Sequence, residues 1–212
     1  MKKNSNLGGV NSQDGADAVK DRYNDWAKQY DQDLRDVKYN LPSIMASIVD
    51  SYIEDKTCSI LDAGAGTGLS GLALNQCGFT NMTAVDFSYE MLEEAKKTNV
   101  YKQTMEGDLS RLAIESNTFD HTVAVGAIGV APKEALEELL RVTKKGGLII
   151  FSNRTNEHYD PSNGFENLCL KMIDDGHWEL LDTKANIVAD TKPNTSPFVI
   201  FVYRKSSEQS QK

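Results

Sequence analysis

The chain has 212 residues, 40% of them hydrophobic and 25% charged, which fits one globular domain and is too short for two ordinary ones. Its formal net charge of −8 would repel nucleic-acid phosphates, and no apolar stretch approaches the roughly 18 residues of a membrane span. The first fifteen residues lack the apolar core of a signal peptide, and the cysteines show no CxxC pair of a zinc site. We therefore expect a cytoplasmic protein with reduced thiols, no metal, no nucleic-acid partner and no membrane contact.

Both ends of the chain differ in composition from the middle. Residues 1–14 and 206–212 are low in apolar residues and rich in Ser, Asn, Gln and Lys, so we expect two disordered tails. Residues 15–205 are expected to form a single domain, with a helical segment over 15–55 and a sheet core over 56–205.

The helical segment contains two amphipathic patterns. Residues 16–34 place apolar side chains three and four positions apart, which predicts one helix. A second helix is expected to follow Pro42, because proline is favoured in the first turn of a helix.

From Cys58 onward, strand-like and helix-like segments alternate. The expected strands cover residues 59–62, 82–86, 101–106, 119–125 and 148–153. The expected helices cover residues 68–77, 89–97 and 133–143, with Gly78 and Gly146 as stops. Alternation at this pitch predicts a doubly wound parallel sheet.

The last part of the chain breaks this alternation. One more helix is expected after Asn163, followed by extended segments at 178–188 and 197–204 with no helical pattern between them. Two strands joined without a crossover helix must run antiparallel. The predicted fold class is therefore α/β, with a mostly parallel seven-stranded sheet that ends in an antiparallel carboxy-terminal hairpin.

The first strand of the core runs into a glycine-rich turn, SILDAGAGTGLSG, at residues 59–71. Its glycines from Gly66 onward satisfy the dinucleotide pattern GxGxxG, which is weak evidence when it stands alone. Asp62 counts against a dinucleotide, because a carboxylate at the strand end would repel a pyrophosphate and suits a ligand with an ammonium and a sulfonium group. The position of the pattern also counts against it, because a dinucleotide turn usually opens directly after the strand.

Two further strands end in acidic residues. Asp86 ends the second strand, where a carboxylate can accept hydrogen bonds from both ribose hydroxyls of an adenosine, and Phe87 beside it is suited to packing on adenine. Asp108 follows the third strand and could instead cap a short helix from Leu109. Since parallel strands end at one edge of the sheet, the carboxylates of Asp62, Asp86 and Asp108 predict a nucleoside site there.

Residues 59–151, with Asp62-x-Gly64-x-Gly66-x-Gly68 and these strand ends, resemble a class I S-adenosylmethionine-dependent methyltransferase. Segments outside that core resemble more narrowly the methyltransferase-like family named after the Williams–Beuren syndrome region. Those segments are residues 23–27, 30–33, 139–143, 154–156 and 198–205. The resemblance implies a Rossmann-like methyltransferase fold, S-adenosylmethionine as cofactor and S-adenosylhomocysteine as product. It also implies that the side chain of Asp108 and the backbone of Leu109 contact the adenine.

In methyltransferases with this kind of amino-terminal helix, the helix folds over the cofactor. Tyr23, Trp26 and Tyr30 share one face of the first helix, so they are expected either in such a lid or as core packing, and aromatic faces attract a sulfonium. The residues expected to contact the cofactor are Tyr23, Trp26, Tyr30, Asp62, Ala63, Gly64, Gly66, Thr67, Gly68, Asp86, Phe87, Gly107, Asp108, Leu109 and Gly126.

The chemistry of methyl transfer leaves the catalytic residue unassigned. A sulfonium is already an activated leaving group, so the protein mainly aligns the acceptor with the methyl group and needs a base only where the acceptor must lose a proton. Arg154, His158 and Tyr159 follow the fifth strand on the acceptor side; Arg154 could bind an acidic substrate, and His158 is expected in a solvated loop. His121 and His177 are expected to be structural.

The leading prediction is a monomeric S-adenosylmethionine-dependent methyltransferase that acts on a small-molecule acceptor by in-line transfer. The residues after the fourth strand, 126–130, lack the Asn/Asp-Pro-Pro-Tyr signature of enzymes that methylate base amino groups. Two alternatives stay open, namely a cofactor-binding protein of the same fold with little activity and an NAD-linked oxidoreductase. Asp62 and the lack of a Tyr-x-x-x-Lys pair disfavour the oxidoreductase.

Overall fold

The computed structural model describes residues 15–192 and 195–207. Of the two expected disordered tails, residues 1–14 and 208–212 lie outside the described residues. Ser206 and Ser207 are described, and Ser206 donates its backbone N–H to the carbonyl of His177.

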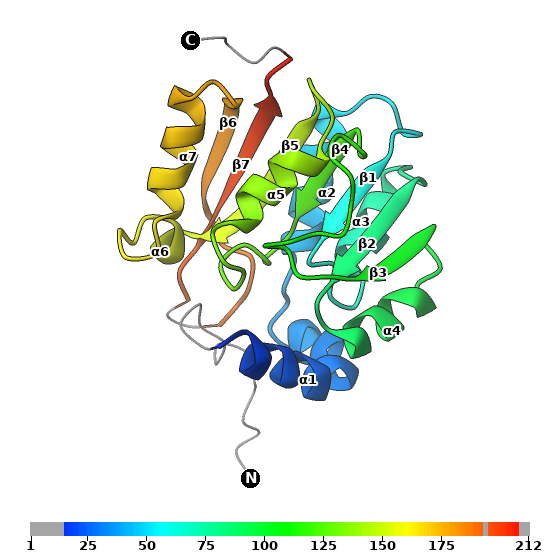
Figure 1. Cartoon of the computed structure of the whole chain (residues 1–212). Coiled ribbons are helices and arrows are strands. Elements are labelled where there is room, and N and C mark those ends of the chain that lie inside the picture. The colour runs from blue at the N-terminus through cyan, green and yellow to red at the C-terminus, as the bar shows by residue number, and fades with distance from the viewer. Residues whose placement is uncertain (1–14, 193–194, 208–212) are drawn as a thin grey trace.

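Seven strands form one sheet in the order β3-β2-β1-β4-β5-β7-β6 (Figure 1). The strands are β1 (Ile60–Ala63), β2 (Met82–Asp86), β3 (Gln103–Glu106), β4 (His121–Ala124), β5 (Leu148–Arg154), β6 (Trp178–Ile187) and β7 (Phe198–Lys205). The first five strands pair in parallel, β7 is antiparallel to β5, and β6 is antiparallel to β7. The predicted mostly parallel sheet with an antiparallel carboxy-terminal hairpin is confirmed.

The helices fall near their predicted positions, with one addition. They are α1 (Ala16–Asp36), α2 (Leu41–Tyr52), α3 (Leu69–Gln76), α4 (Tyr89–Lys97), α5 (Ala135–Val142), α6 (Thr155–His158) and α7 (Phe165–Asp174). The short helix α6 was not predicted, because four residues are too few to show a helical period. Local signals explain several ends. Pro42 lies in the first turn of α2, and the Ser88 side chain caps α4 by accepting from the backbone N–H of Met91.

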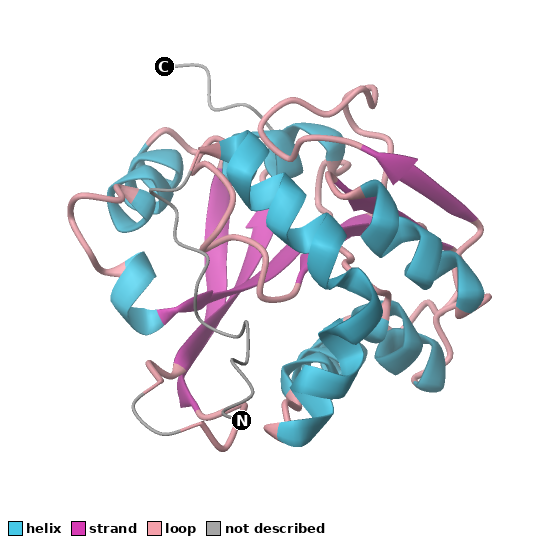
Figure 2. Ribbon diagram, turned by 90° about the horizontal axis from the view of Figure 1, so that it is seen from below, coloured by secondary structure: helices cyan, strands magenta, loops and turns pink. Residues whose placement is uncertain are grey.

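Helices cover both faces of the sheet (Figure 2). The alternation of side chains along each strand divides the core accordingly, so that Ile60 of β1 packs with α2 and α3 while Leu61 packs with α5 and α7. Because the central parallel strands are buried on both faces, β1 consists entirely of buried residues. The helix α1 lies across the carboxyl ends of the parallel strands beside α4 (Figure 1).

The histidines differ in part from expectation. The prediction that His158 lies in a solvated loop is wrong, since it is 2% exposed in α6 and its ring centroid lies 4.4 Å from that of Phe201. Burial lowers its pKa to about 4. His121 is structural as predicted, because its Nδ1 accepts a hydrogen bond from the backbone N–H of Leu148 and ties β4 to β5.

The cysteines and acidic residues give no sign of a metal site in the part of the chain that the structure describes. Cys58 and Cys169 are buried, Cys77 is half-buried, and burial raises the pKa of the Cys58 thiol to about 11. Within residues 15–192 and 195–207, no group of three or more His, Cys, Asp or Glu side chains is placed to hold a metal ion. None of the described helices is long and apolar enough to cross a membrane.

Candidate functional site

A cavity of about 540 Å³ opens at the carboxyl ends of the parallel strands, under α1. This volume lies within the usual range for small-molecule and cofactor sites. Nine of the predicted site residues line it, namely Tyr23, Tyr30, Gly64, Gly66, Asp86, Phe87, Asp108, Leu109 and Gly126. The structure thus brings together residues from α1 and from the ends of β1, β2, β3 and β4, as a sheet of this type requires.

Six predicted site residues do not line this cavity. They are Trp26, Asp62, Ala63, Thr67, Gly68 and Gly107. Ala63 is fully buried in β1, and Gly107 donates its backbone N–H to the carbonyl of Asp86. Gly68 precedes α3 with φ of 90°, so it provides the left-handed turn into the helix. Ala63, Gly68 and Gly107 therefore support the strand ends and the turn without lining the cavity.

The glycine turn holds its shape through two positions that favour glycine for different reasons. Gly64 has φ of 71°, and a Cβ placed there would lie 2.4 Å from the Cβ of Ala127 in the loop after β4. Gly66 has φ of 54°, and a Cβ there would have no protein atom within 4 Å. The turn therefore packs tightly against the β4 loop at Gly64 and leaves open space at Gly66, which lines the cavity.

Asp62 is a fully buried anchor of the turn. Its Oδ2 accepts hydrogen bonds from the Ser70 hydroxyl and the Tyr101 hydroxyl, both at 2.6 Å, while its Oδ1 is buried without a hydrogen-bond partner among the described residues. Burial raises the pKa of this carboxyl, against the effect of both hydroxyls. The Tyr101 hydroxyl also accepts from the backbone N–H of Gly71, so one network holds β1, α3 and the approach to β3 together.

Asp86 lies in the cavity wall with its carboxylate held by backbone donors. Its Oδ2 accepts from the N–H of Gly66 and its Oδ1 from the N–H of Ser88, each at 2.9 Å. It is 5% exposed, and burial raises its pKa to about 6 despite these hydrogen bonds. Each carboxylate oxygen has a further lone pair, so the group can still accept hydrogen bonds from a ligand.

Asp108 is not buried as Asp86 is, and it does not cap a helix. Its side chain is exposed, and Oδ1 accepts from both the N–H and the hydroxyl of Ser110 at 2.8 Å. The following residues form a turn and no helix, so the alternative of a helix starting at Leu109 is wrong. Leu109 is buried and contributes an apolar part of the cavity wall.

The helix α1 is joined to the strand ends by three polar contacts. Lys20 Nζ lies 2.6 Å from Glu106 at the end of β3, and the Ser88 hydroxyl donates to Asn24 Oδ1 at 2.7 Å. The Thr67 hydroxyl in the glycine turn donates to Asp31 Oδ1 at 2.6 Å. Because these contacts are spaced along the helix, α1 closes the cavity from the side opposite the sheet.

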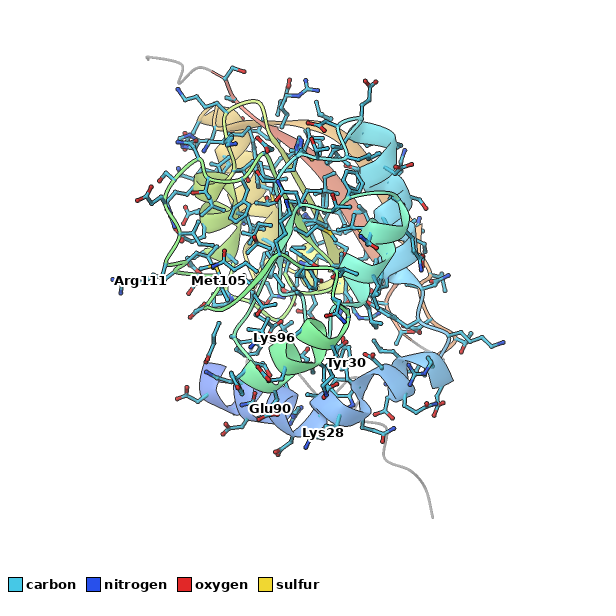
Figure 3. All side chains as sticks on the ribbon, turned by 90° about the vertical axis from the view of Figure 1, so that its right-hand side faces the viewer. Lys28, Tyr30, Glu90, Lys96, Met105 and Arg111 are labelled. Atoms are coloured by element: carbon cyan, nitrogen blue, oxygen red, sulfur yellow. The ribbon has the colours of Figure 1, made fainter. Side chains whose placement is uncertain are left out.

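The aromatic residues of α1 are in contact with one another on its inner face. The ring centroids of Trp26 and Tyr30 are 4.6 Å apart, and the Tyr23 ring meets the Phe87 ring edge-on at 5.7 Å. Figure 3 shows Tyr30 on the side of α1 that faces the rest of the molecule, with Lys28 on the outer side. The Trp26 indole N–H donates to Asp33 Oδ2 at 2.8 Å, so this ring combines the predicted core packing with a fixed orientation.

Several lining residues were not predicted. They are Val19, Met91, Val125, Ala127, Val130, Ala131, Pro132, Lys133, Ser162, Asn163 and Phe165. The loop after β4 could have been inferred from its place at a strand end. Residues 162–165 carry no local signal, because they reach the cavity only through the way α7 packs on the sheet.

A second cavity of about 280 Å³ adjoins the first. The two share Tyr23, Tyr30, Gly126 and Val130 in their walls. Trp26 and Arg154 line the second cavity. The Arg154 guanidinium donates to the carbonyl of Ser196, lies over the Phe198 ring at 4.3 Å from its centroid, and is 3.5 Å from Asp190 Oδ2.

Comparison with known families finds a match over the segment that supplies most of the first cavity's walls. Residues 61–151, from β1 to β5, match the family described as "Methyltransferase domain". This span contains the glycines of the turn and the three strand-end carboxylates, Asp62, Asp86 and Asp108. This span resembles the class I S-adenosylmethionine-dependent methyltransferases. The predicted resemblance to that class is confirmed.

Relatives of the methyltransferase domain occur in distant organisms. The chain is 36% identical over 140 residues to human "Methyltransferase-like protein 27". The aligned residues make up 63% of this chain and 57% of that protein. It is 38% identical over 112 residues to "Malonyl-[acyl-carrier protein] O-methyltransferase" of Buchnera aphidicola, covering 52% of this chain and 44% of that protein. The chain thus spans about half the length of the curated relatives it matches.

Solved structures share the methyltransferase fold over nearly the whole chain. One is a putative methyltransferase of Haloferax volcanii, solved in complex with the Trm112 methyltransferase activator, with a TM-score of 0.67 and 18% identity. The match covers 90% of this chain and 98% of that one. At this identity the likeness shows the fold alone.

Proposed function

We propose that this protein is an S-adenosylmethionine-dependent methyltransferase that transfers a methyl group to a small-molecule acceptor. The observation that carries the proposal is Asp86, a buried carboxylate in the wall of a cofactor-sized cavity, within a span that matches a methyltransferase domain. We further propose that it acts as a monomer in the cytoplasm.

The residues that line the cavity support the proposed cofactor. Asp86 would accept hydrogen bonds from the ribose hydroxyls, and Phe87 and Leu109 would pack on the adenine, with Asp108 at its amino group. The open space at Gly66 would let the backbone of the turn approach the ligand closely. Asp62 does not line the cavity, so we propose that it acts on the cofactor site through the turn that it anchors.

The residues of this chain would contribute mainly alignment and exclusion of water. The bound cofactor supplies a methyl group on a positively charged sulfur. Tyr23 and Tyr30 on α1 would shield that charge with their aromatic faces and close the cavity. Gly126 and Val130, in the walls of both cavities, would bring the acceptor beside the methyl group for in-line transfer.

Calorimetric titration with S-adenosylmethionine, S-adenosylhomocysteine and NAD tests the proposal. We expect both adenosyl ligands to bind and NAD to give no heat, because the carboxylate of Asp62, buried behind the glycine turn, would repel a pyrophosphate there. Binding of NAD alone would overturn the proposal in favour of an oxidoreductase. Binding of the adenosyl ligands without methyl transfer to any member of a metabolite panel, followed by mass spectrometry, would favour a cofactor-binding protein with little activity.

A further inference from the structure

The wall of the second cavity includes a side chain with an unpaired hydrogen-bond donor. Asn153, near the end of β5, lines this cavity and is 1% exposed. Its Oδ1 accepts from the backbone N–H of Arg154 at 2.8 Å, which identifies the other atom of the amide as the NH₂ group. That Nδ2 is buried and has no hydrogen-bond partner among the described residues. A buried donor left unpaired is costly, so a ligand oxygen at this place would gain its hydrogen bond.

The loop after β4 holds this amide in position. A Cβ at Gly129 would lie 2.6 Å from Asn153 Oδ1, so the backbone of the loop approaches the amide as only glycine allows. Gly129 also lines the second cavity. The amide therefore belongs to a built wall, with its oxygen side fixed by the chain and its nitrogen side unpaired.

Five aromatic residues line the same cavity, namely Tyr23, Trp26, Tyr30, Tyr39 and Phe198. Trp26 and Tyr30 form one contact pair on α1, and Tyr39 and Phe198 form another, edge-on, with ring centroids 6.3 Å apart. Aromatic rings favour a flat, conjugated occupant through stacked or edge-to-face contacts. The volume of about 280 Å³ lies just below the usual range for drug-sized ligands, so the occupant is small.

The charges in the wall favour a neutral occupant. The charged residues that line this cavity are Arg154 and Glu157. The guanidinium of Arg154 is already paired with Asp190 and with a carbonyl, so it offers little unbalanced positive charge. The carboxylate of Glu157, which accepts from Asn163 Nδ2 at 2.9 Å, would repel an anion.

We propose that the second cavity binds the methyl acceptor, and that this acceptor is a small neutral aromatic molecule whose carbonyl or hydroxyl oxygen accepts a hydrogen bond from Asn153. The proposal rests on the methyltransferase function proposed above, because the shared walls place such a molecule beside the transferred methyl group. It assigns Asn153 as a residue that determines substrate specificity.

Two matched probes test the preference for a neutral molecule. 4-Hydroxyacetophenone presents a neutral carbonyl, and 4-hydroxybenzoate presents a carboxylate at the same position of the same ring. With the protein saturated in S-adenosylhomocysteine, we expect calorimetry to show binding of the ketone and at least tenfold weaker binding of the carboxylate. Equal or tighter binding of the carboxylate, or no binding of the ketone, would overturn the proposal.

Asn153→Asp tests the donor, because it keeps the oxygen that accepts from Arg154 and replaces the NH₂ group with an acceptor. We expect affinity for the ketone to fall roughly tenfold, with the affinity for S-adenosylhomocysteine unchanged within about twofold. The control is Asn81→Asp. Asn81 precedes β2 at the amino ends of the parallel strands, where its side chain donates to the carbonyl of Thr57, and it lines neither cavity. Unchanged affinity for the ketone in Asn153→Asp would contradict the assignment of Asn153 as the hydrogen-bond donor to the acceptor.

Two safeguards keep the test decisive. If thermal unfolding shows that Asn153→Asp does not fold, Asn153→Ala removes the donor without adding a charge, and the comparison of probes on the unaltered protein stands by itself. If S-adenosylhomocysteine fails to bind, the proposed function fails. Titration of the ketone into the free protein then still decides whether the second cavity takes such a molecule.

Discussion

At the scale of single residues, the site depends on what each strand-end side chain already contacts within the protein. Asp62 lies one residue before the end of β1 and Asp86 ends β2; both are buried, yet only Asp86 lines the cavity. The Oδ2 of Asp62 accepts hydrogen bonds from the hydroxyls of Ser70 and Tyr101. Asp86 instead accepts from the backbone N–H groups of Gly66 in the turn and of Ser88, the N-cap of α4. Equal positions in the sequence pattern therefore have different roles.

The raised pKa of Asp86 predicts a pH dependence of cofactor binding. The ionised carboxylate is the form that accepts from ribose hydroxyls, and its pKa of about 6 means that it gains a proton as the pH falls through 6. We expect the affinity for S-adenosylhomocysteine to fall roughly tenfold between pH 7 and pH 5, as the ionised fraction falls by that factor. Asp86→Asn should weaken binding at pH 7 by about 1.5–3 kcal/mol and abolish this pH dependence. Calorimetry over this pH range measures both, and an unaltered pH profile in Asp86→Asn would contradict the assignment.

The glycine turn offers a matched pair of substitutions. Gly64→Ala and Gly66→Ala both place alanine in a left-handed conformation, which costs roughly 1–2 kcal/mol. Gly64→Ala also drives a Cβ against Ala127, so urea unfolding should show the larger loss of stability for this variant. Gly66→Ala fills open space in the cavity wall, so it should weaken binding of S-adenosylhomocysteine more than its modest loss of stability suggests. Equal losses of stability in the two variants would contradict the predicted clash.

At the scale of elements, α1 covers the first cavity and is attached to the strand ends partly through polar contacts. Its contacts to the strand ends are made by Lys20, Asn24 and Asp31, and the exposed Lys20–Glu106 ion pair contributes little. The two part-buried hydrogen bonds contribute about 1 kcal/mol each. The aromatic residues on its inner face add the apolar part of the same interface.

The lid predicted for α1 can be tested by weakening one of these contacts. Asp31→Ala removes the acceptor of the Thr67 hydroxyl, and we expect roughly fivefold faster hydrogen exchange over 16–36 and a similar loss of affinity for S-adenosylhomocysteine. The control is Asp36→Ala, because Asp36 accepts from Gln32 within the same helix. In the unaltered protein, saturating S-adenosylhomocysteine should slow exchange over α1. If it leaves exchange there unchanged, α1 is not a lid.

At the scale of the whole molecule, the two functions proposed for the cavities follow from the sheet order. The strands β1 and β4 are neighbours whose following helices, α3 and α5, lie on opposite faces, so their carboxyl ends part and leave room for a ligand. The first cavity lies over the ends of β1, β2, β3 and β4. The second lies toward β5 and β7, where the antiparallel hairpin brings Phe198 beside Arg154. The acceptor cavity proposed here therefore needs the hairpin.

Local patterns in the sequence predicted most of the fold. Strand β2 and helix α4 have the predicted bounds, because the side-chain periodicity of a strand or a helix is a property of neighbouring residues. Strand β3 begins at Gln103, later than predicted, since the side chain of Tyr101 is bound to Asp62. That contact joins residues far apart in the chain, and no local pattern could reveal it.

The sequence by itself thus determined the order of helices and strands, the glycine turn and the edge of the sheet at which the site lies, because these depend on short-range sterics and on side-chain periodicity. Only the tertiary structure decided which side chains face the cavities. It buried His158 against Phe201, placed Asp62 behind the turn, and left the amide of Asn153 unpaired in the wall of a second cavity. Each of these outcomes depends on segments that meet only when the sheet is packed between its helices.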